Sequence, residues 1–285
     1  MNHKLFLFSL FLSSLLLSAC DADYIIREEP QLVVEGWIES GGFPHVIVTK
    51  TIPVSEERKS IDEVADCLIR WAKITVSDGE REVILSGFAD KSIIPPYIYR
   101  TTEMVGEVGK TYTLKVEYED FVATATTTIP EIVPIKSIKQ NKVEGTDDQY
   151  TLTLSFDDPE PKGNYYKVFS SPTPNCRQFF STYLSVLSDE ILGKQVDVEV
   201  YPGHTIQDME DFNLFYKKDD TVSVRLCSID ESAYNFWRDY GDIQSFGRNY
   251  MLPYTKNIRT NMVGAYGYWC GYGTDNKVVT IGEKP

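Results

Sequence analysis

Residues 111–129 read TYTLKVEYEDFVATATTTI, and this stretch decides the fold class. Apolar side chains at every second position from Tyr112 to Tyr118 share one face of an extended segment, which is the pattern of a half-buried β-strand. Asp120 stands at the turn, and the run Phe121–Ile129 returns as a second strand. The stretch therefore predicts an antiparallel hairpin with one buried face.

The same pattern extends toward the amino terminus. Residues 32–38 (LVVEGWI) and 45–50 (HVIVTK) are rich in β-branched residues, with glycines in the turn between them. Asp78-Gly79 separates two further apolar runs, which is a strong short-range signal for a hairpin. Together with the hairpin these segments predict an antiparallel sandwich of immunoglobulin-like type. The mixed segment Glu56–Trp71 is expected to be a loop or a short helix.

The second half continues as strands, expected at residues 150–156, 165–169, 196–201 and 221–227. Two helices are expected between them, at Arg177–Leu187 and at Ser232–Tyr240, where Ser232 or Asp230 would cap the first turn. We therefore expect an all-β protein of two antiparallel β-sandwich domains (immunoglobulin or fibronectin-like), the second with one or two short helices. The expected division is a signal peptide at 1–19, a lipidated tether at 20–30, an N-terminal β-sandwich at 31–132 and a C-terminal β-rich domain at 133–285.

The first residues have the pattern of a lipoprotein leader. Lys4 precedes the apolar run Leu5–Leu17, which is too short to span a bilayer, and Leu17-Ser18-Ala19-Cys20 follows. The Cys20 thiol after this small pair resembles the diacylglycerol acceptor of bacterial lipoproteins. A triacylated Cys20 would hold the chain firmly on a membrane, since one acyl chain alone binds only marginally. The alternative is a soluble exported protein with a cysteine here by chance.

The acidic segment Asp21-Ala22-Asp23 bears on sorting. In enterobacterial lipoproteins an aspartate at this position resembles an inner-membrane retention signal, whereas in Bacteroidota acidic residues here resemble a surface-export signal. A solvated linker is the third interpretation. The segment alone therefore does not assign the membrane.

Cysteine usage fits an exported protein. Five cysteines are present, and with Cys20 assigned to lipid an even number remains for disulfides, whose pairing the sequence leaves open. The candidate disulfide cysteines are Cys67, Cys176, Cys227 and Cys270. Zinc is the alternative, but there is no Cys-x-x-Cys pair, and His45 and His204 lie far from any ligand spacing. We expect no metal and no cofactor.

The composition excludes two classes of protein. With 28 Lys and Arg against 42 Asp and Glu, the net charge of −14 argues against a nucleic-acid partner, because such proteins need a cationic surface to displace counterions. A hydrophobic fraction of 42% and an aromatic fraction of 13% are ample for packed cores and exclude a disordered acidic chain.

Sequence motifs of common catalytic classes are absent. The chain has no Gly-x-Ser-x-Gly nucleophile turn and no glycine-rich phosphate loop with lysine. A glycosidase pair would depend on the distance between two carboxylates in space. Acidic clusters are explained as turn residues at strand ends; if one of them binds calcium, Asp157 and Asp158 are the expected ligands. We expect no catalytic residues.

The carboxyl-terminal segment interleaves glycine with aromatic residues. Flat rings with a polar edge suit sugar faces and protein interfaces alike. The alternative is that the rings fill the core of the second sandwich. The candidate ligand or partner surface comprises Tyr250, Tyr254, Tyr266, Tyr268, Trp269 and Tyr272.

Short motifs in a fixed order carry a resemblance to a known family. The first half contains LVVEGWI (32–38), TVSDG (75–79), GKTYTL (109–114) and Ile129-Pro130. The second half contains FDDP (156–159), NYY (164–166), LSD (187–189), SID (228–230) with Tyr234, and NMVGAYG (261–267). The chain resembles the Bacteroidota lipoprotein family catalogued as domain of unknown function 4249, across nearly all of the mature length. It departs from the usual closing pattern at Tyr268-Trp269-Cys270.

The resemblance implies an outer-membrane lipoprotein, of a kind often encoded beside TonB-dependent receptors, and it supplies no catalytic residues. We expect a non-catalytic binding or accessory component that is anchored through Cys20 and faces the periplasm or the cell surface. The expected partner is a TonB-dependent receptor. The sequence does not identify the ligand, which is expected to be a glycan or another small molecule. The alternatives are an envelope hydrolase acting on glycan or peptide and a free-standing glycan-binding or adhesin module.

Overall fold

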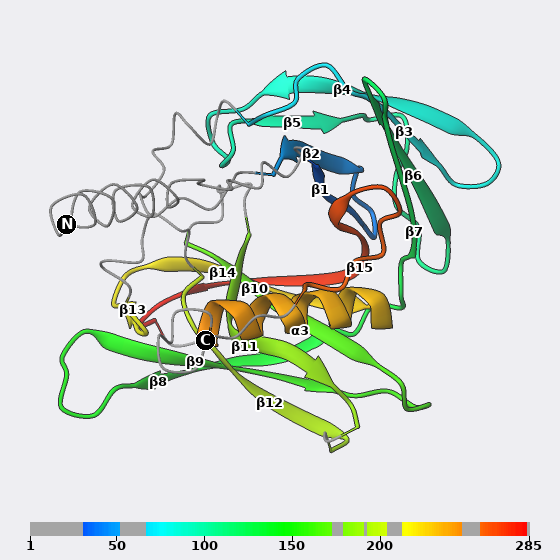
Figure 1. Cartoon of the computed structure of the whole chain (residues 1–285). Helices are drawn as coiled ribbons and strands as arrows, with labels where there is room; N and C mark the ends of the chain where they lie inside the picture. Colours follow the sequence, from blue (N-terminus) through cyan, green and yellow to red (C-terminus); the bar gives the residue numbers. More distant parts are fainter. Residues whose placement is uncertain are drawn as a thin grey trace, which may run out of the picture.

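The computed structural model describes residues 31–51, 67–172, 179–190, 193–203, 213–246 and 257–283, and at 183–184 and 244–246 only their backbone. Within these ranges the protein is almost entirely β, with one helix and two sheets, which confirms the all-β sandwich class (Figure 1). The elements are β1 (Leu32–Glu39), β2 (His45–Lys50), β3 (Lys73–Ser77), β4 (Glu82–Ala89), β5 (Tyr97–Arg100), β6 (Thr111–Tyr118), β7 (Phe121–Thr128), β8 (Ile135–Lys142), β9 (Gln149–Asp157), β10 (Tyr165–Ser171), β11 (Phe180–Ser188), β12 (Gln195–Val200), β13 (Tyr216–Lys217), β14 (Thr221–Ile229), α3 (Glu231–Phe246) and β15 (Tyr266–Thr280).

One large sheet runs through both halves of the chain. Its strand order is β11-β10-β14-β15-β1-β2-β5-β4-β3-β6-β7, and the second sheet has the order β12-β9-β13 with β8 also paired to β9. The predicted hairpin at 111–129 is present as β6 and β7, paired in register from Thr111 opposite Thr128 to Tyr118 opposite Phe121. Asp78-Gly79 likewise joins β3 to β4.

Strand β15 connects the two halves. Its first part, Tyr266 to Tyr272, pairs in parallel with β1, and its second part, Gly273 to Thr280, pairs antiparallel with β14. In Figure 1 it crosses the middle of the molecule, between the strands of the first half and those of the second. The last described strand therefore lies inside the large sheet, fourth in its order of eleven strands.

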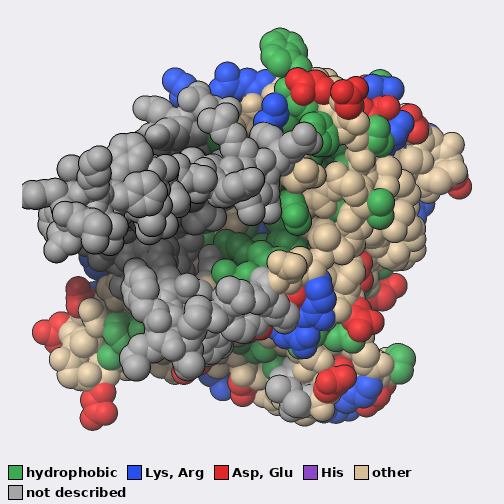
Figure 2. All heavy atoms as spheres, viewed as in Figure 1, with side chains coloured by type: hydrophobic (Ala, Val, Ile, Leu, Met, Phe, Trp, Pro, Cys, Tyr) green, Lys and Arg blue, Asp and Glu red, His purple; other side chains and the backbone are tan. Residues whose placement is uncertain are grey.

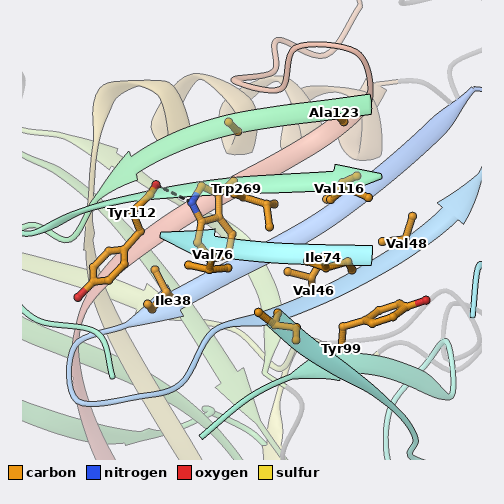
Figure 3. Close-up of a cluster of buried hydrophobic side chains, with 14 of the residues drawn as sticks. Ile38, Val46, Val48, Ile74, Val76, Tyr99, Tyr112, Val116, Ala123 and Trp269 are labelled. Carbon is orange, nitrogen blue, oxygen red and sulfur yellow. Dashed lines mark hydrogen bonds between the residues drawn. The ribbon is translucent and has the colours of Figure 1, made fainter. Parts of the chain in front are cut away.

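The first core is enclosed where the large sheet curls so that β6 and β7 face β1 and β15. Alternate residues of these strands meet there, and Trp269 is fully buried among them (Figure 3). Gly36 leaves room for this ring, because a Cβ at Gly36 would lie 2.8 Å from an atom of the indole. Gly267, at φ +100°, passes so close to β1 that a Cβ would lie 1.9 Å from the carbonyl oxygen of Val34.

The second core lies between the two sheets, where buried residues of β8, β9 and β12 pack against β10 and β14. It begins at Val133, whereas the first core contains residues up to Ile129 and then Met262 and Trp269 from the end of the chain. The domain division at residue 132 stays a prediction. The structure adds that the carboxyl-terminal segment contributes Met262 and Trp269 to the first core.

Helix α3 covers the opposite face of the large sheet. Asp230 caps it, since its Oδ1 accepts a hydrogen bond from the Ala233 amide at 2.8 Å. Ala233, Phe236 and Trp237 recur at helical spacing and are buried against the sheet. The helix expected at Ser232–Tyr240 is therefore confirmed, and it is longer than predicted.

The helix expected at Arg177–Leu187 is wrong. Residues 180–188 form strand β11, paired with β10, with a register shift opposite Lys167 and Phe169. An apolar run of this length is locally compatible with either a helix or a strand. Here the run forms a strand because it pairs with the open edge of β10. Most of Glu56–Trp71 lies outside the described residues.

Candidate functional site

The aromatic residues of β15 alternate between two cores. Trp269 lies in the first core, and Tyr268 and Tyr272 lie in the cluster beneath α3, which also holds Phe236 and Trp237. These three residues of the predicted binding surface are therefore buried side chains, because both faces of β15 are covered. None of them lies in the core of the second sandwich, where the alternative expected them. Tyr266 is 56% exposed. Tyr250 and Tyr254 lie outside the described residues, as does Cys20.

Two of the candidate disulfide cysteines, Cys227 and Cys270, are buried free thiols in the cluster beneath α3. Burial raises the pKa of both thiols. Cys176 lies outside the described residues, and Cys67 lies on the segment that pairs with β2. Disulfide pairing therefore stays a prediction.

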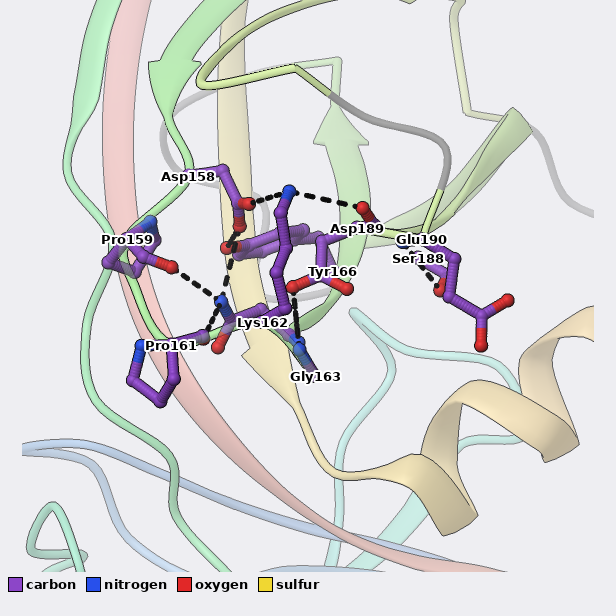
Figure 4. A network of polar contacts seen from close by, with 10 residues as sticks. Asp158, Pro159, Pro161, Lys162, Gly163, Tyr166, Ser188, Asp189 and Glu190 are labelled. Atoms are coloured by element: carbon purple, nitrogen blue, oxygen red, sulfur yellow. Dashed lines mark hydrogen bonds and ion pairs between the residues drawn. The ribbon is translucent and has the colours of Figure 1, made fainter.

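Two neighbouring motifs and a third, about twenty residues further along the chain, meet at one end of the second sandwich. Asp158 (from FDDP), Asn164 and Tyr166 (from NYY) and Asp189 (from LSD) form one polar network with Lys162 (Figure 4). Asp158 and Asp189 are both buried. We call this set the Asp158–Asp189 network.

Within the network, Asp158 accepts hydrogen bonds from three side chains. The Tyr166 hydroxyl donates to Oδ1 at 2.5 Å, Asn164 Nδ2 donates to the same oxygen at 3.3 Å, and Lys162 Nζ lies 3.0 Å from Oδ2. Burial, followed by the bond to Asp158, raises the pKa of Tyr166. The bond to Asp158 likewise raises the pKa of Lys162.

Asp189 holds the backbone of the connection between β9 and β10. Its Oδ2 accepts the amide hydrogens of Gly163 at 2.7 Å and Asn164 at 2.8 Å. Lys162 Nζ also donates to the Asp189 main-chain carbonyl at 3.2 Å. Both oxygens of Asp158 and Oδ2 of Asp189 are therefore engaged with the protein itself.

A shallow pocket opens beside this network, with a cavity volume of about 410 Å³, lined by Lys162, Gly163, Tyr165, Asp189 and Glu190. The Tyr165 ring stacks on Tyr234 of α3, with ring centroids 4.8 Å apart, and the Arg238 guanidinium lies 5.2 Å from the Tyr234 ring. Burial, with nearby Glu231 and Glu190, raises the pKa of Tyr165. We call Lys162, Tyr165, Glu190, Tyr234 and Arg238 the Tyr165 surface.

The expected calcium ligands point to different partners. Asp157 forms an exposed ion pair with Lys136 at 2.8 Å, whereas Asp158 belongs to the buried network. In the part of the chain that the structure describes, no group of three or more His, Cys, Asp or Glu side chains is placed to hold a metal ion. His45 stacks on Trp37 with ring centroids 5.2 Å apart, and His204 is not among the described residues.

Sequence reasoning missed a buried lysine beneath α3. Lys167 lies on β10 with its Nζ 5.0 Å from the Trp237 ring and 5.2 Å from the Phe169 ring. It donates hydrogen bonds to the hydroxyls of Ser181 and Ser185, at the register shift of β11. Burial lowers its pKa to about 7. The only signal in the sequence is a lysine between the apolar residues Tyr166 and Val168.

Residues 20–277 match a family model described as a domain of unknown function, DUF4249. The chain belongs to the DUF4249 family. No curated protein matches it. The family match covers the Asp158–Asp189 network, the Tyr165 surface and all of α3. Among the described residues, no helix is both long and apolar enough to cross a membrane.

Proposed function

We propose that this DUF4249 protein is a lipid-anchored lipoprotein of the bacterial outer membrane, of the Bacteroidota type, and that it acts as a non-catalytic binding or accessory component. The leader that ends in Leu17-Ser18-Ala19-Cys20 supports the anchor. The family match that begins at residue 20 agrees with a mature chain starting at the lipidated cysteine.

The observation that carries the binding role is the arrangement around Tyr165. Asp158 and Asp189 are buried and accept hydrogen bonds from the connection that they hold. A general acid or base must reach the substrate. Asp158 is not among the residues that line the pocket, and Asp189, which does line it, accepts two backbone amides at Oδ2. Tyr165 and Tyr234, by contrast, are half-buried at the surface beside the pocket, where rings with polar edges suit contacts to a protein or a sugar.

The proposed partner is a TonB-dependent receptor in the same membrane, and the Tyr165 surface is its proposed contact. The test is crosslinking of native outer membranes followed by affinity recovery of the full chain and identification of the bound proteins. We expect recovery of a TonB-dependent receptor with the wild type and loss of it with Tyr165→Ala. Tyr266→Ala removes an exposed ring elsewhere and should leave recovery unchanged. Equal recovery of the receptor with both variants would contradict the assignment of the Tyr165 surface as its contact.

The anchor has its own test. Labelled palmitate should enter the wild type and not Cys20→Ala, and Cys20→Ala should leave the membrane fraction in a high-salt wash. Retention of Cys20→Ala on membranes would contradict the lipid anchor.

An envelope hydrolase is the second candidate, favoured by one contact. Lys167 Nζ donates to Ser181 Oγ at 2.6 Å, and a lysine with a pKa lowered to about 7 beside a serine is the pairing used in Ser-Lys hydrolases. Ser181 is half-buried, which leaves part of it accessible. A fluorophosphonate probe that labels the wild type and not Ser181→Ala would support this function, and no labelling would reject it. If the protein is instead a free-standing glycan-binding or adhesin module, a glycan should raise the melting temperature of the purified protein in the absence of any receptor.

A further inference from the structure

Trp71 is the most exposed large hydrophobic side chain in the described part of the protein, at 89%. It lies in the turn between the segment at 67–69 and strand β3. A tryptophan left almost wholly in water forgoes a large hydrophobic gain, since its ring is among the largest apolar surfaces of any side chain. Such exposure calls for a partner.

The backbone around Trp71 is held rigidly by two tyrosines of β5. The Tyr99 hydroxyl donates to the Ile69 carbonyl at 2.9 Å and accepts from the Ala72 amide at 3.0 Å. The Tyr97 hydroxyl donates to the Arg70 carbonyl at 3.1 Å. These bonds fix the chain on both sides of Trp71, so the ring projects from a preformed turn.

The segment that leads to this turn begins, at Cys67, at the end of the sheet where the tether joins the protein. Gln31, the first described residue, accepts a hydrogen bond at its carbonyl from the Thr51 amide at 2.9 Å, and the amide of the preceding residue, Lys50, donates to the Cys67 carbonyl at 2.9 Å. Ten residues lie between Cys20 and Gln31, so the chain takes eleven steps from one to the other. At about 3.3–3.6 Å per residue, the anchor is within roughly 40 Å of this end of the sheet.

The residues beside Trp71 suit a lipid interface. Arg70 and Lys73 flank it and are exposed. Figure 2 shows Lys and Arg side chains gathered with hydrophobic ones along the upper edge of the molecule, above β4 and β5, with Asp and Glu farther along. Tryptophan with flanking Arg and Lys is the usual composition of side chains at the level of lipid headgroups.

We propose that Trp71 enters the headgroup region of the bilayer that carries the Cys20 lipid, so that this end of the sheet faces the membrane. The proposal rests on the lipid anchor of the proposed function. The anchor gives attachment, and Trp71 gives orientation. Because the chain's net charge of −14 opposes approach to anionic lipid, the proposal is tested on zwitterionic vesicles.

The experiment uses the full lipidated protein in phosphatidylcholine vesicles whose acyl chains are brominated, which quenches tryptophan fluorescence at the membrane. The chain has four tryptophans, of which Trp237 and Trp269 are buried. The difference between the wild type and Trp71→Phe therefore isolates the signal of Trp71. We expect brominated lipid to quench a component in the wild type that is lost in Trp71→Phe. Equal quenching in both proteins overturns the proposal.

The matched control moves the indole to the turn of the β1–β2 hairpin. Phe43 is 38% exposed in the turn between β1 and β2, at the end away from Gln31. In the double variant Trp71→Phe/Phe43→Trp we expect no quenching by brominated lipid and full access to acrylamide in the water. Quenching of this second indole to the same degree would mean that no face is preferred, which also overturns the proposal.

Flotation and palmitate labelling separate the two proposals. Labelled protein that floats with vesicles but shows no quenching of Trp71 overturns the orientation alone. Protein that takes up no palmitate overturns the anchor, and the orientation with it.

Discussion

The indole Nε1 of Trp269 donates a hydrogen bond to the main-chain carbonyl oxygen of Tyr112 at 3.0 Å, across 157 positions of sequence. Asn261 holds the backbone of the same tryptophan, accepting from its amide at 3.0 Å and donating to its carbonyl at 2.7 Å. A residue near the carboxyl terminus is therefore a central part of the first core.

We expect Trp269→Ala to lower the free energy of unfolding by about 3–5 kcal/mol, because it leaves a cavity where the ring fills the core and removes a buried hydrogen bond. Urea unfolding of the purified protein measures this. Tyr266→Ala, three residues earlier on the same strand and exposed, should change it by less than about 0.5 kcal/mol. Similar losses for both would contradict the central place of Trp269.

The adjacent residues Asp157 and Asp158 offer a comparison of an exposed with a buried carboxylate. Asp158→Ala leaves the buried Tyr166 hydroxyl without its acceptor, and we expect a cost of about 1–3 kcal/mol. Asp157→Ala breaks an exposed ion pair with Lys136 and should cost less than about 1 kcal/mol. Urea unfolding measures the free energy of unfolding of both variants. Equal losses would contradict a structural role for the Asp158–Asp189 network.

Lys167 should make stability depend on pH. Its pKa is lowered from 10.5 to about 7 in the folded protein, mainly by burial and against the opposing effect of Cys227. Above about pH 7 the unfolded chain therefore binds a proton that the folded chain lacks, so the free energy of unfolding rises with pH, by up to about 1.4 kcal/mol per unit.

Urea unfolding between pH 7.0 and 7.7, below the pKa of about 8.5 at which cysteine titrates in the unfolded chain, measures this slope. Lys167→Met should flatten it, whereas Lys139→Met, at an exposed position of β8, should leave it unchanged. A slope that persists in Lys167→Met would assign the pH dependence to another group.

Cys227 and Cys270 should resist alkylation in the folded protein. Both thiols are buried, and burial raises their pKa, which lowers the thiolate fraction that reacts. Iodoacetamide at pH 8 followed by mass spectrometry should find them unmodified until urea is added. Prompt modification without urea would contradict their burial. The same measurement without reductant reports disulfides, and four free thiols beside the lipidated cysteine would remove that prediction.

The local patterns in the sequence predicted local structure well. Alternation defined β6 and β7, and the cap at Asp230 with aromatic residues at helical spacing indicated α3. For β11 the pattern failed, because its apolar run is compatible with either structure and the open edge of β10 decides the outcome. Local propensity carries no information about which edges remain free.

The candidate site depended on non-local information. The resemblance singled out the motifs that contain Asp158, Asn164 and Asp189 but left them as separate short matches. Asp158 and Asn164 meet locally, six residues apart, but only the pairing of β10 with β11 brings Asp189 to them. The burial of Tyr268 and Tyr272 likewise follows from the parallel pairing of β15 with β1, which joins the two ends of the chain and has no local signal.

The central place of β15 also bears on how the protein matures. A chain that crosses a membrane amino terminus first presents β1 long before residues 266–272 arrive to pair with it. Until then one edge of β1 lacks its partner and the first core lacks Trp269, and exposed edges and open cores of this kind are prone to aggregation. Under the proposed export, the first half would therefore complete its fold only after residues 266–272 have crossed the membrane.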